Sequence, residues 1–229
     1  MKSRAETGRV RRALNHEPPA DDATPLRRLD RWQAETMREE LADLYVESSH
    51  AASGQGYRSR QEFLRRLAAD VRRPGFAMVI AQGATLTGCV YGFPAGRDGS
   101  WWQGYTGTLP ENYEQLTASG HVFAVAEMLI HPGESGQDFG HRLQDGLLSE
   151  QDASLAATML DQADAEACAA FLSRGWTEIG EAAGIREGAQ PTRLRVLVTQ
   201  IGERTAQGPD DGLTHDAHTQ PPEGSAETR

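Results

Sequence analysis

The sequence predicts an α/β fold. Apolar runs of strand length alternate with segments whose apolar residues recur at helical spacing, and a chain of 229 residues is long enough to bury a substantial core. The most informative run, residues 123–148, combines an apolar strand, a short polar turn with glycine, and an amphipathic helix. Because a helix start exposes unpaired N–H groups, this order favours a backbone site for an anion such as pyrophosphate.

The periodicities predict the order β, α, α, β, β for the first half of the chain and β, α, β, α, β, β for the second. Trp32 falls on the apolar face of the first helix, and Ser59 is the expected N-cap of the next one, which Pro74 and Gly75 end. The expected elements are a strand at 25–29, helices at 30–48 and 59–71, strands at 76–81, 88–93 and 122–130, a helix at 137–149, a strand at 155–160, a helix at 164–173, and strands at 176–180 and 193–201.

Composition limits the classes of partner. A formal net charge of -10 argues against a nucleic-acid or anionic-membrane surface, because both are bound mainly through Lys and Arg. Cys89 and Cys168 lack the spacing of a zinc site or a disulfide framework, so we expect no metal and a reducing, cytoplasmic compartment. Residues 1–23 and 203–229 are poor in large apolar side chains, which predicts two disordered tails around one domain at 24–202.

Two segments carry a resemblance to a known family. The first is the strand AVAEMLIHP followed by SGQDFGHRLQDGLL. The second, LAATMLDQADAEACAAFLSRGWTEIGE, reads as a strand, an Ala-rich helix and a terminal Gly-Trp before the next strand. With the element order of residues 25–201, they resemble the GNAT superfamily of acyl-CoA-dependent N-acyltransferases. The resemblance implies a mixed, mostly antiparallel sheet, splayed at its centre and flanked by helices.

The resemblance also implies a reaction, namely transfer of an acetyl or similar acyl group from CoA to a primary amine on a small molecule or peptide. Acetyl-CoA would be the co-substrate. Its pantetheine would pair with the backbone of Met128, Leu129 and Ile130 as an added strand does. The residues implied around its pyrophosphate are Ser135, Gly136, Gln137, Asp138, Phe139 and Gly140.

The turn departs from the family pattern in its charge. Gly136 and Gly140 match the first and third small positions, and a small residue at Gly140 lets the helix start approach the phosphates. Ser135 and Asp138 stand in place of Arg/Gln and Gly, and a carboxylate in a phosphate cradle sets like charge against like. The alternative interpretation is that Ser135 or Asp138 merely caps the helix.

Glu127, inside the apolar strand, is the predicted general base. An amine nucleophile arrives protonated, so the reaction needs a group that accepts its proton, directly or through water. A charged residue in an apolar run faces a cleft, a partner or solvent, so a plain solvent-facing or edge position is the alternative. His121 and His131, at the two ends of this strand, are secondary candidates, because histidine is a common general base.

The second helix lacks the acid that the family uses to protonate the departing thiolate. The usual tyrosine would fall at Phe171 or Leu172, and neither carries a proton. Water can fill this role, because a thiolate with a thiol pKa near 8.5 is a good leaving group. Cys168 lies on the same helix, where a small cysteine among alanines is typical of a core position.

The acceptor side stays open. Trp101, Trp102, Tyr105 and Tyr113 either line a cleft for a cationic amine or form a satellite hydrophobic cluster under a long loop. A competing hypothesis is a catalytically degenerate member that keeps the fold as a binding or interaction module. A third is an α/β domain unrelated to CoA, and a homodimer is among the assemblies left open.

Overall fold

The computed structural model describes residues 24–48, 56–134, 137–184 and 192–202 of the chain. Seven strands of this part form one sheet in the order β1-β2-β3-β4-β5-β7-β6, in which β4 and β5 are the one parallel pair. The predicted α/β fold with a mostly antiparallel sheet is confirmed. The two expected tails, 1–23 and 203–229, lie outside the described residues.

The element bounds follow the predicted order closely. The strands are β1 (Leu26–Leu29), β2 (Ala77–Gln82), β3 (Leu86–Pro94), β4 (Val122–Ile130), β5 (Leu155–Asp161), β6 (Thr177–Gly184) and β7 (Thr192–Gln200). The helices are α1 (Arg31–Thr36), α2 (Arg38–Ser48), α3 (Gly56–Asp70), α4 (Glu111–Ser119), α5 (Gln137–Leu148) and α6 (Ala165–Ser173), with a short 3₁₀ turn at Ser100–Trp102.

Three predictions about the helices were wrong. The helix expected at 30–48 is two helices separated at Met37, and the α1 start is fixed by a capping box between Asp30 and Gln33. Trp32 is 64% exposed, with the Arg31 guanidinium carbon 4.6 Å from its ring centroid, so it does not belong to the core. Ser59 lies within the first turn of α3 rather than at its N-cap. The sequence analysis missed α4 altogether.

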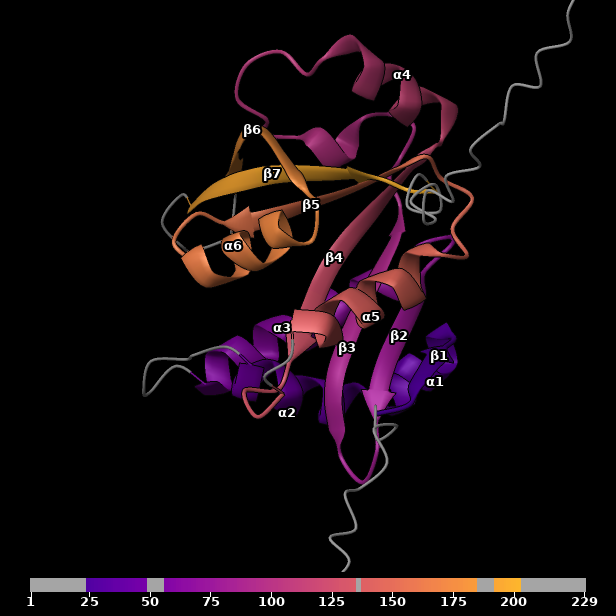
Figure 1. The fold of residues 1–229 in the computed structure, drawn as a ribbon, viewed down its shortest axis with the longest axis vertical. Coiled ribbons are helices and arrows are strands. Elements are labelled where there is room, and N and C mark those ends of the chain that lie inside the picture. Colours follow the sequence, from indigo (N-terminus) through magenta and orange to yellow (C-terminus); the bar gives the residue numbers. More distant parts are fainter. Residues whose placement is uncertain (1–23, 49–55, 135–136, 185–191, 203–229) are drawn as a thin grey trace, which may run out of the picture.

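Helices cover both faces of the sheet, as Figure 1 shows. On one face α2 and α3 bury Leu41, Leu44, Phe63 and Leu67 against β2 and β3. On the other, α5 packs across β2 and β3 in a second cluster that also holds Phe171 and Trp176 of the α6 region. Burial of two such apolar layers is the main stabilisation of this fold class.

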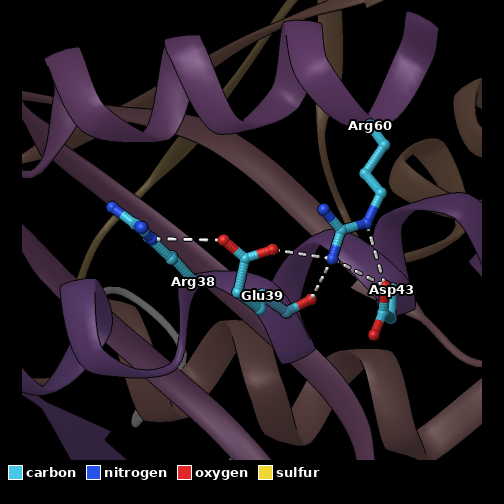
Figure 2. A network of polar contacts seen from close by, with 4 residues as sticks. All are labelled: Arg38, Glu39, Asp43 and Arg60. Carbon is cyan, nitrogen blue, oxygen red and sulfur yellow. Dashed lines mark hydrogen bonds and ion pairs between the residues drawn. The ribbon is translucent and has the colours of Figure 1, made fainter. Parts of the chain in front are cut away.

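An ionic network joins α2 to α3 (Figure 2). The Arg60 Nη2 atom of α3 lies 2.8 Å from Glu39 Oε2 and 3.0 Å from Asp43 Oδ1, both on α2, and Arg38 reaches Glu39 from the other side. One arginine therefore bridges two carboxylates of the neighbouring helix, which adds polar contacts to the apolar packing of α2 on α3. The position of α3 is important for the candidate site, because α3 carries Arg66.

The segment between β3 and β4, residues 95–121, packs over β6, the edge strand of the sheet. Tyr105 forms an isolated bridge with Ala182, and its hydroxyl donates to the Ile179 carbonyl at 2.6 Å. Trp102 Nε1 donates to Thr117 Oγ1 of α4 at 2.8 Å, inside a third apolar cluster. The aromatic residues of this segment thus hold it on the sheet and cover part of an edge that would otherwise offer free backbone groups.

Candidate functional site

The two halves of the sheet separate along β4. This strand pairs with β3 over its whole length, but with β5 only from Val122 to Ala124. Beyond Ala124 no strand of the described sheet pairs with its second edge. In Figure 1, β5 and β7 run across the view while β2, β3 and β4 run up it, so the halves diverge. The splayed centre that the family resemblance implies is present, and it exposes backbone groups able to bind an extended ligand.

A β-bulge lies at the start of this separation. Tyr91 faces Glu127 and Gly92 faces Val125, which leaves Ala126 as an extra residue in β4. The close approach of β4 requires glycine at position 92, because a Cβ there would lie 2.2 Å from the Ala124 carbonyl oxygen.

The bulge decides which face Glu127 occupies. Before it, Phe123 and Val125 point into the α5 cluster, whereas after it Met128 and Ile130 do. The alternation of side chains therefore shifts by one residue, and Glu127 lies on the α2–α3 face with Leu129. Regular alternation from Phe123 would place it on the opposite face. Strand periodicity alone therefore does not give the orientation of this carboxylate.

Glu127 forms an ion pair with Arg66 of α3. Its Oε2 atom accepts a hydrogen bond from Arg66 Nη2 at 3.0 Å, and the two side chains are 23% and 31% exposed, so solvent still reaches both. The guanidinium carbon of Arg66 also lies 5.4 Å from the Tyr45 ring centroid. Burial by itself would lower the pKa of Arg66, but Glu127 and Tyr45 bring it above the ordinary value. Arg66 and Glu127 therefore neutralise each other next to the splay, the gap between the two halves of the sheet beyond Ala124.

Two further titratable groups lie next to this pair. Tyr91, the cross-strand neighbour of Glu127, is buried, and burial together with the Glu127 charge raises the pKa of its hydroxyl well above the ordinary value. Burial and Glu127 also raise the pKa of the Cys89 thiol. Both groups stay protonated near neutral pH, so neither is a nucleophile in the resting protein.

The predicted cofactor-binding residues that the structure describes belong to two elements, the end of β4 and the start of α5. Met128, Leu129 and Ile130 form the end of β4 that pairs with β3 but not with β5, and Leu129 is buried while the other two are half-buried. Gln137 begins α5, Asp138 is exposed in its first turn, and Ser135 and Gly136 lie outside the described residues. The positions of the described residues are compatible with the predicted contacts to pantetheine and pyrophosphate. Those contacts remain predictions.

Phe139 and Gly140 occupy buried positions in the first turn of α5. The Phe139 ring fills the space left by Gly88 of β3, where a Cβ would be 2.7 Å from the ring. Phe139 is therefore a core side chain, so its predicted role at the anion site depends on its backbone amide. Gly140 lies against the Arg174 guanidinium, which enters from the end of α6.

Sequence analysis missed both arginines that border this region. Arg66 lies between the core residues Phe63 and Leu67, and Arg174 immediately follows α6. Neither belongs to a motif, and an arginine on a helix or after its end is ordinarily a solvated surface group. Only the packing of α3 and α6 against the sheet brings them to the site.

The helix α6 has no acid at the expected place. Phe171 is buried, in edge-to-face contact with Trp176 at 5.1 Å between ring centroids, and Leu172 is 41% exposed. Cys168 is buried, as expected of a core cysteine. Its Sγ atom lies 3.7 Å from the Asp161 carbonyl, which satisfies its weak donor.

The histidines and the aromatic segment lie away from Glu127. His121 is exposed at the far end of β4, and His131 accepts from the Gly133 amide and lies 3.7 Å from Glu47. Trp101, Trp102, Tyr105 and Tyr113 all join the third apolar cluster, as the satellite-cluster alternative predicts.

A cavity of about 510 Å³ lies within the aromatic segment, and Arg97, Asp98, Trp102, Tyr105 and Glu114 are among the residues that line it. All of its lining residues come from the β3–β4 connection and α4. The cavity is therefore separate from the splay.

Within the described ranges, no group of three or more His, Cys, Asp and Glu side chains is arranged to hold a metal ion. In the same part of the chain, no helix combines the length and apolarity that crossing a membrane requires.

Comparison with known proteins identifies the fold. No protein-family model and no curated protein matches the sequence. A probable acetyltransferase from Staphylococcus epidermidis is similar in structure, with a TM-score of 0.53 and 12% identity over 77% of this chain and 98% of that chain. An aminoglycoside 6′-acetyltransferase type Ii is also similar in structure, with a TM-score of 0.52 and 12% identity over 77% of this chain and 96% of that chain.

A chimeric spermidine N-acetyltransferase from Vibrio cholerae gives a TM-score of 0.50 at 12% identity, over 77% of this chain and 94% of that chain. The similarity spans nearly the whole of these structures, although few residues are identical. The described part of this chain therefore has the fold of these acetyltransferases, which is the fold that the resemblance to the GNAT superfamily implies.

Proposed function

We propose that this protein is an N-acyltransferase that moves an acetyl or similar acyl group from CoA to a primary amine. The observation that carries the proposal is the edge of β4 beyond Ala124, which pairs with no described strand; β4 ends at Ile130, and α5 begins soon afterwards in the chain at Gln137. An extended pantetheine can pair with such an edge, and the helix start can hold the pyrophosphate attached to it. Met128, Leu129 and Ile130 would make the first contact, and the amides of residues 136–140 the second.

Glu127 is the proposed base. The amine nitrogen attacks the thioester carbonyl, a C–N bond forms, the C–S bond breaks, and the proton lost by the amine passes to the carboxylate, directly or through water. Arg66 would hold the carboxylate in place through their 3.0 Å contact. Arg66 is thus a positioning residue in this scheme.

Water would protonate the leaving thiolate. The family tyrosine is replaced at both candidate positions, by the buried Phe171 and the exposed Leu172. A thiolate is a sufficiently weak base to leave without a dedicated acid, so the absent tyrosine lowers the rate without abolishing transfer.

The acceptor is proposed only as a primary amine, on a small molecule or a peptide. Two of the similar structures are named for amine acceptors, spermidine and an aminoglycoside. The net charge of -10 favours a cationic acceptor through long-range attraction. The cytoplasmic compartment and a homodimer remain predictions.

Thermal melting with and without millimolar acetyl-CoA tests the first half of the proposal. A ligand that binds only the folded state raises the midpoint, so a rise that grows with concentration is expected. An unchanged midpoint would refute acyl-CoA binding. Release of free thiol from acetyl-CoA, followed with a panel of primary amines, then tests the transfer.

A second candidate, a degenerate module that binds CoA or a protein without catalysis, is favoured by Asp138 in the α5 start and by the missing acid of α6. A module that binds CoA predicts a melting shift with acetyl-CoA but no amine-dependent thiol release, and a module that binds only a protein predicts neither. The two measurements together therefore separate the candidates.

A further inference from the structure

The seam between α5 and the end of α6 is the most unusual polar arrangement in the described chain. It consists of Gly140 and Gln144 on α5 and of Arg174 and Trp176 after α6. Trp176 Nε1 donates to Gln144 Oε1 at 2.7 Å in a buried contact. One turn earlier on α5, a Cβ on Gly140 would lie 2.1 Å from Arg174 Nη2, so the guanidinium occupies the space that glycine leaves open.

This seam holds more hydrogen-bond donors than acceptors. Arg174 Nε and Gln144 Nε2 are both buried without a hydrogen-bond partner, and no carboxylate in the described ranges pairs with Arg174. Burial lowers the pKa of Arg174, because no anion offsets the loss of water around its charge. Two buried donors without acceptors are rare in a finished core.

The position of Arg174 adds a second unfavourable contribution. Gly140 belongs to the first turn of α5, and the start of a helix carries the positive end of its dipole. The helix start repels the Arg174 guanidinium packed against it, whereas an anion would be attracted by both the helix start and the guanidinium. The Arg174 guanidinium carbon lies 5.9 Å from the Phe171 ring centroid, which helps to keep it in this place.

We propose that Arg174 binds the pyrophosphate of acyl-CoA, together with the backbone amides at the start of α5. The inference rests on the proposed function, and it assigns a residue that the turn itself lacks, since residues 131–141 contain neither Lys nor Arg. A guanidinium donates two parallel hydrogen bonds to a phosphate, so it suits this ligand better than a lysine does. Arg174 would also offset the negative charge that Asp138 brings to the same turn.

The test is a calorimetric titration of the full chain with three ligands. Acetyl-CoA carries every phosphate, acetyl-dephospho-CoA lacks only the 3′-phosphate, and S-acetylpantetheine lacks them all. Arg174→Gln is compared with wild type and with Arg193→Gln, a change that removes the same charge from a side chain of β7 that is 77% exposed.

We expect Arg174→Gln to weaken acetyl-CoA and acetyl-dephospho-CoA binding by about tenfold to a hundredfold, the usual effect of losing a charged hydrogen bond. Acetylpantetheine binding and the Arg193→Gln affinities should not change. The melting midpoint without ligand should stay or rise in Arg174→Gln, because a partly buried charge without a paired carboxylate has been removed.

Three results would overturn the assignment. Equal binding of acetyl-CoA by wild type and Arg174→Gln would remove Arg174 from the site while leaving the proposed function intact. A loss confined to acetyl-CoA would place Arg174 on the 3′-phosphate instead, and a lowered midpoint with equal loss for all three ligands would mean a structural role. Absence of acetyl-CoA binding by wild type would refute the proposed function itself.

Discussion

Two arginines border the splay from opposite faces of the sheet, and they differ in whether their charge is matched. Arg66 of α3 donates to Glu127 at 3.0 Å. Arg174, beyond α6, lies against Gly140 with its Nε buried and unpartnered. A partly buried charge that is paired needs no ligand to explain it, whereas one without a paired anion is stabilised when an anion binds beside it.

The comparison assigns different tasks to the two faces. The α3 face holds a carboxylate in a fixed position, which suits a proton acceptor. The α6 face holds a positive charge beside a helix start, which suits a phosphate. Changes on the first face should therefore affect turnover, and changes on the second should affect acyl-CoA affinity.

The largest expected effect is on turnover in Glu127→Gln. Loss of a general base lowers kcat by about a hundredfold to ten-thousandfold. The free energy of unfolding should fall by only about 1–2 kcal/mol, since glutamine still accepts from Arg66 but no longer neutralises it. Thiol release and urea denaturation measure the two quantities.

Arg66→Gln is the matched control for that change, because it breaks the same ion pair but keeps the carboxylate. It should reduce stability by a similar amount and turnover by a smaller factor. Equal turnover losses in both variants would mean that Glu127 acts only through the ion pair, and full activity in Glu127→Gln would remove it from the mechanism.

An intermediate effect is expected on the second face in Gly140→Ala. The added methyl group would meet the Arg174 guanidinium at 2.1 Å and displace it, so acetyl-CoA affinity should fall about tenfold. Without ligand the helix should be as stable or more stable by up to about 1 kcal/mol, because alanine is the better helix former. Calorimetry and thermal melting provide both measurements.

Gly146→Ala, on the same helix, is the control. Its Cβ would lie 3.4 Å from Leu26 Cδ1 and from Val79 Cγ1, an ordinary contact. It should gain stability from helix propensity without changing acetyl-CoA affinity. If the two alanine variants bind equally well, the space at Gly140 does not serve the ligand.

The sequence predicted most of the fold, because strand and helix periods are local properties. The bounds of β4 and the start of α5 agree with the prediction. Local patterns were misleading where the helix bounds differ from those that the apolar spacing predicts. Trp32 fits the apolar stripe of one long helix, but the structure has a separate short helix that begins after the capping box at Asp30 and ends before Met37, and its ring is exposed.

The site was less predictable than the fold. Glu127 stands out in sequence because a charge in an apolar strand is unusual, but the bulge at Ala126 that turns it towards Arg66 leaves no sequence signal. The contact between Gly140 and Arg174 joins residues far apart in sequence, and only packing of α6 near the start of α5 creates it. Motifs therefore identified the elements of the site and missed its charges.

The smallest expected effect concerns a second carboxylate on the α3 face, and it tests whether the arginines of this face need that carboxylate as a partner. Asp70 of α3 lies 3.4 Å from Arg73, and burial raises the pKa of its carboxyl despite the opposing effect of Arg73 and Arg66. Because the folded pKa exceeds the unfolded one, ionised Asp70 disfavours folding at neutral pH, and this cost disappears as the pH falls through the folded pKa. Asp70→Asn should therefore be more stable than wild type at pH 7, by about 0.5 kcal/mol, and the difference should shrink towards pH 3. Urea denaturation at both pH values measures it, and a variant that is less stable at pH 7 would show that the two arginines need this second carboxylate.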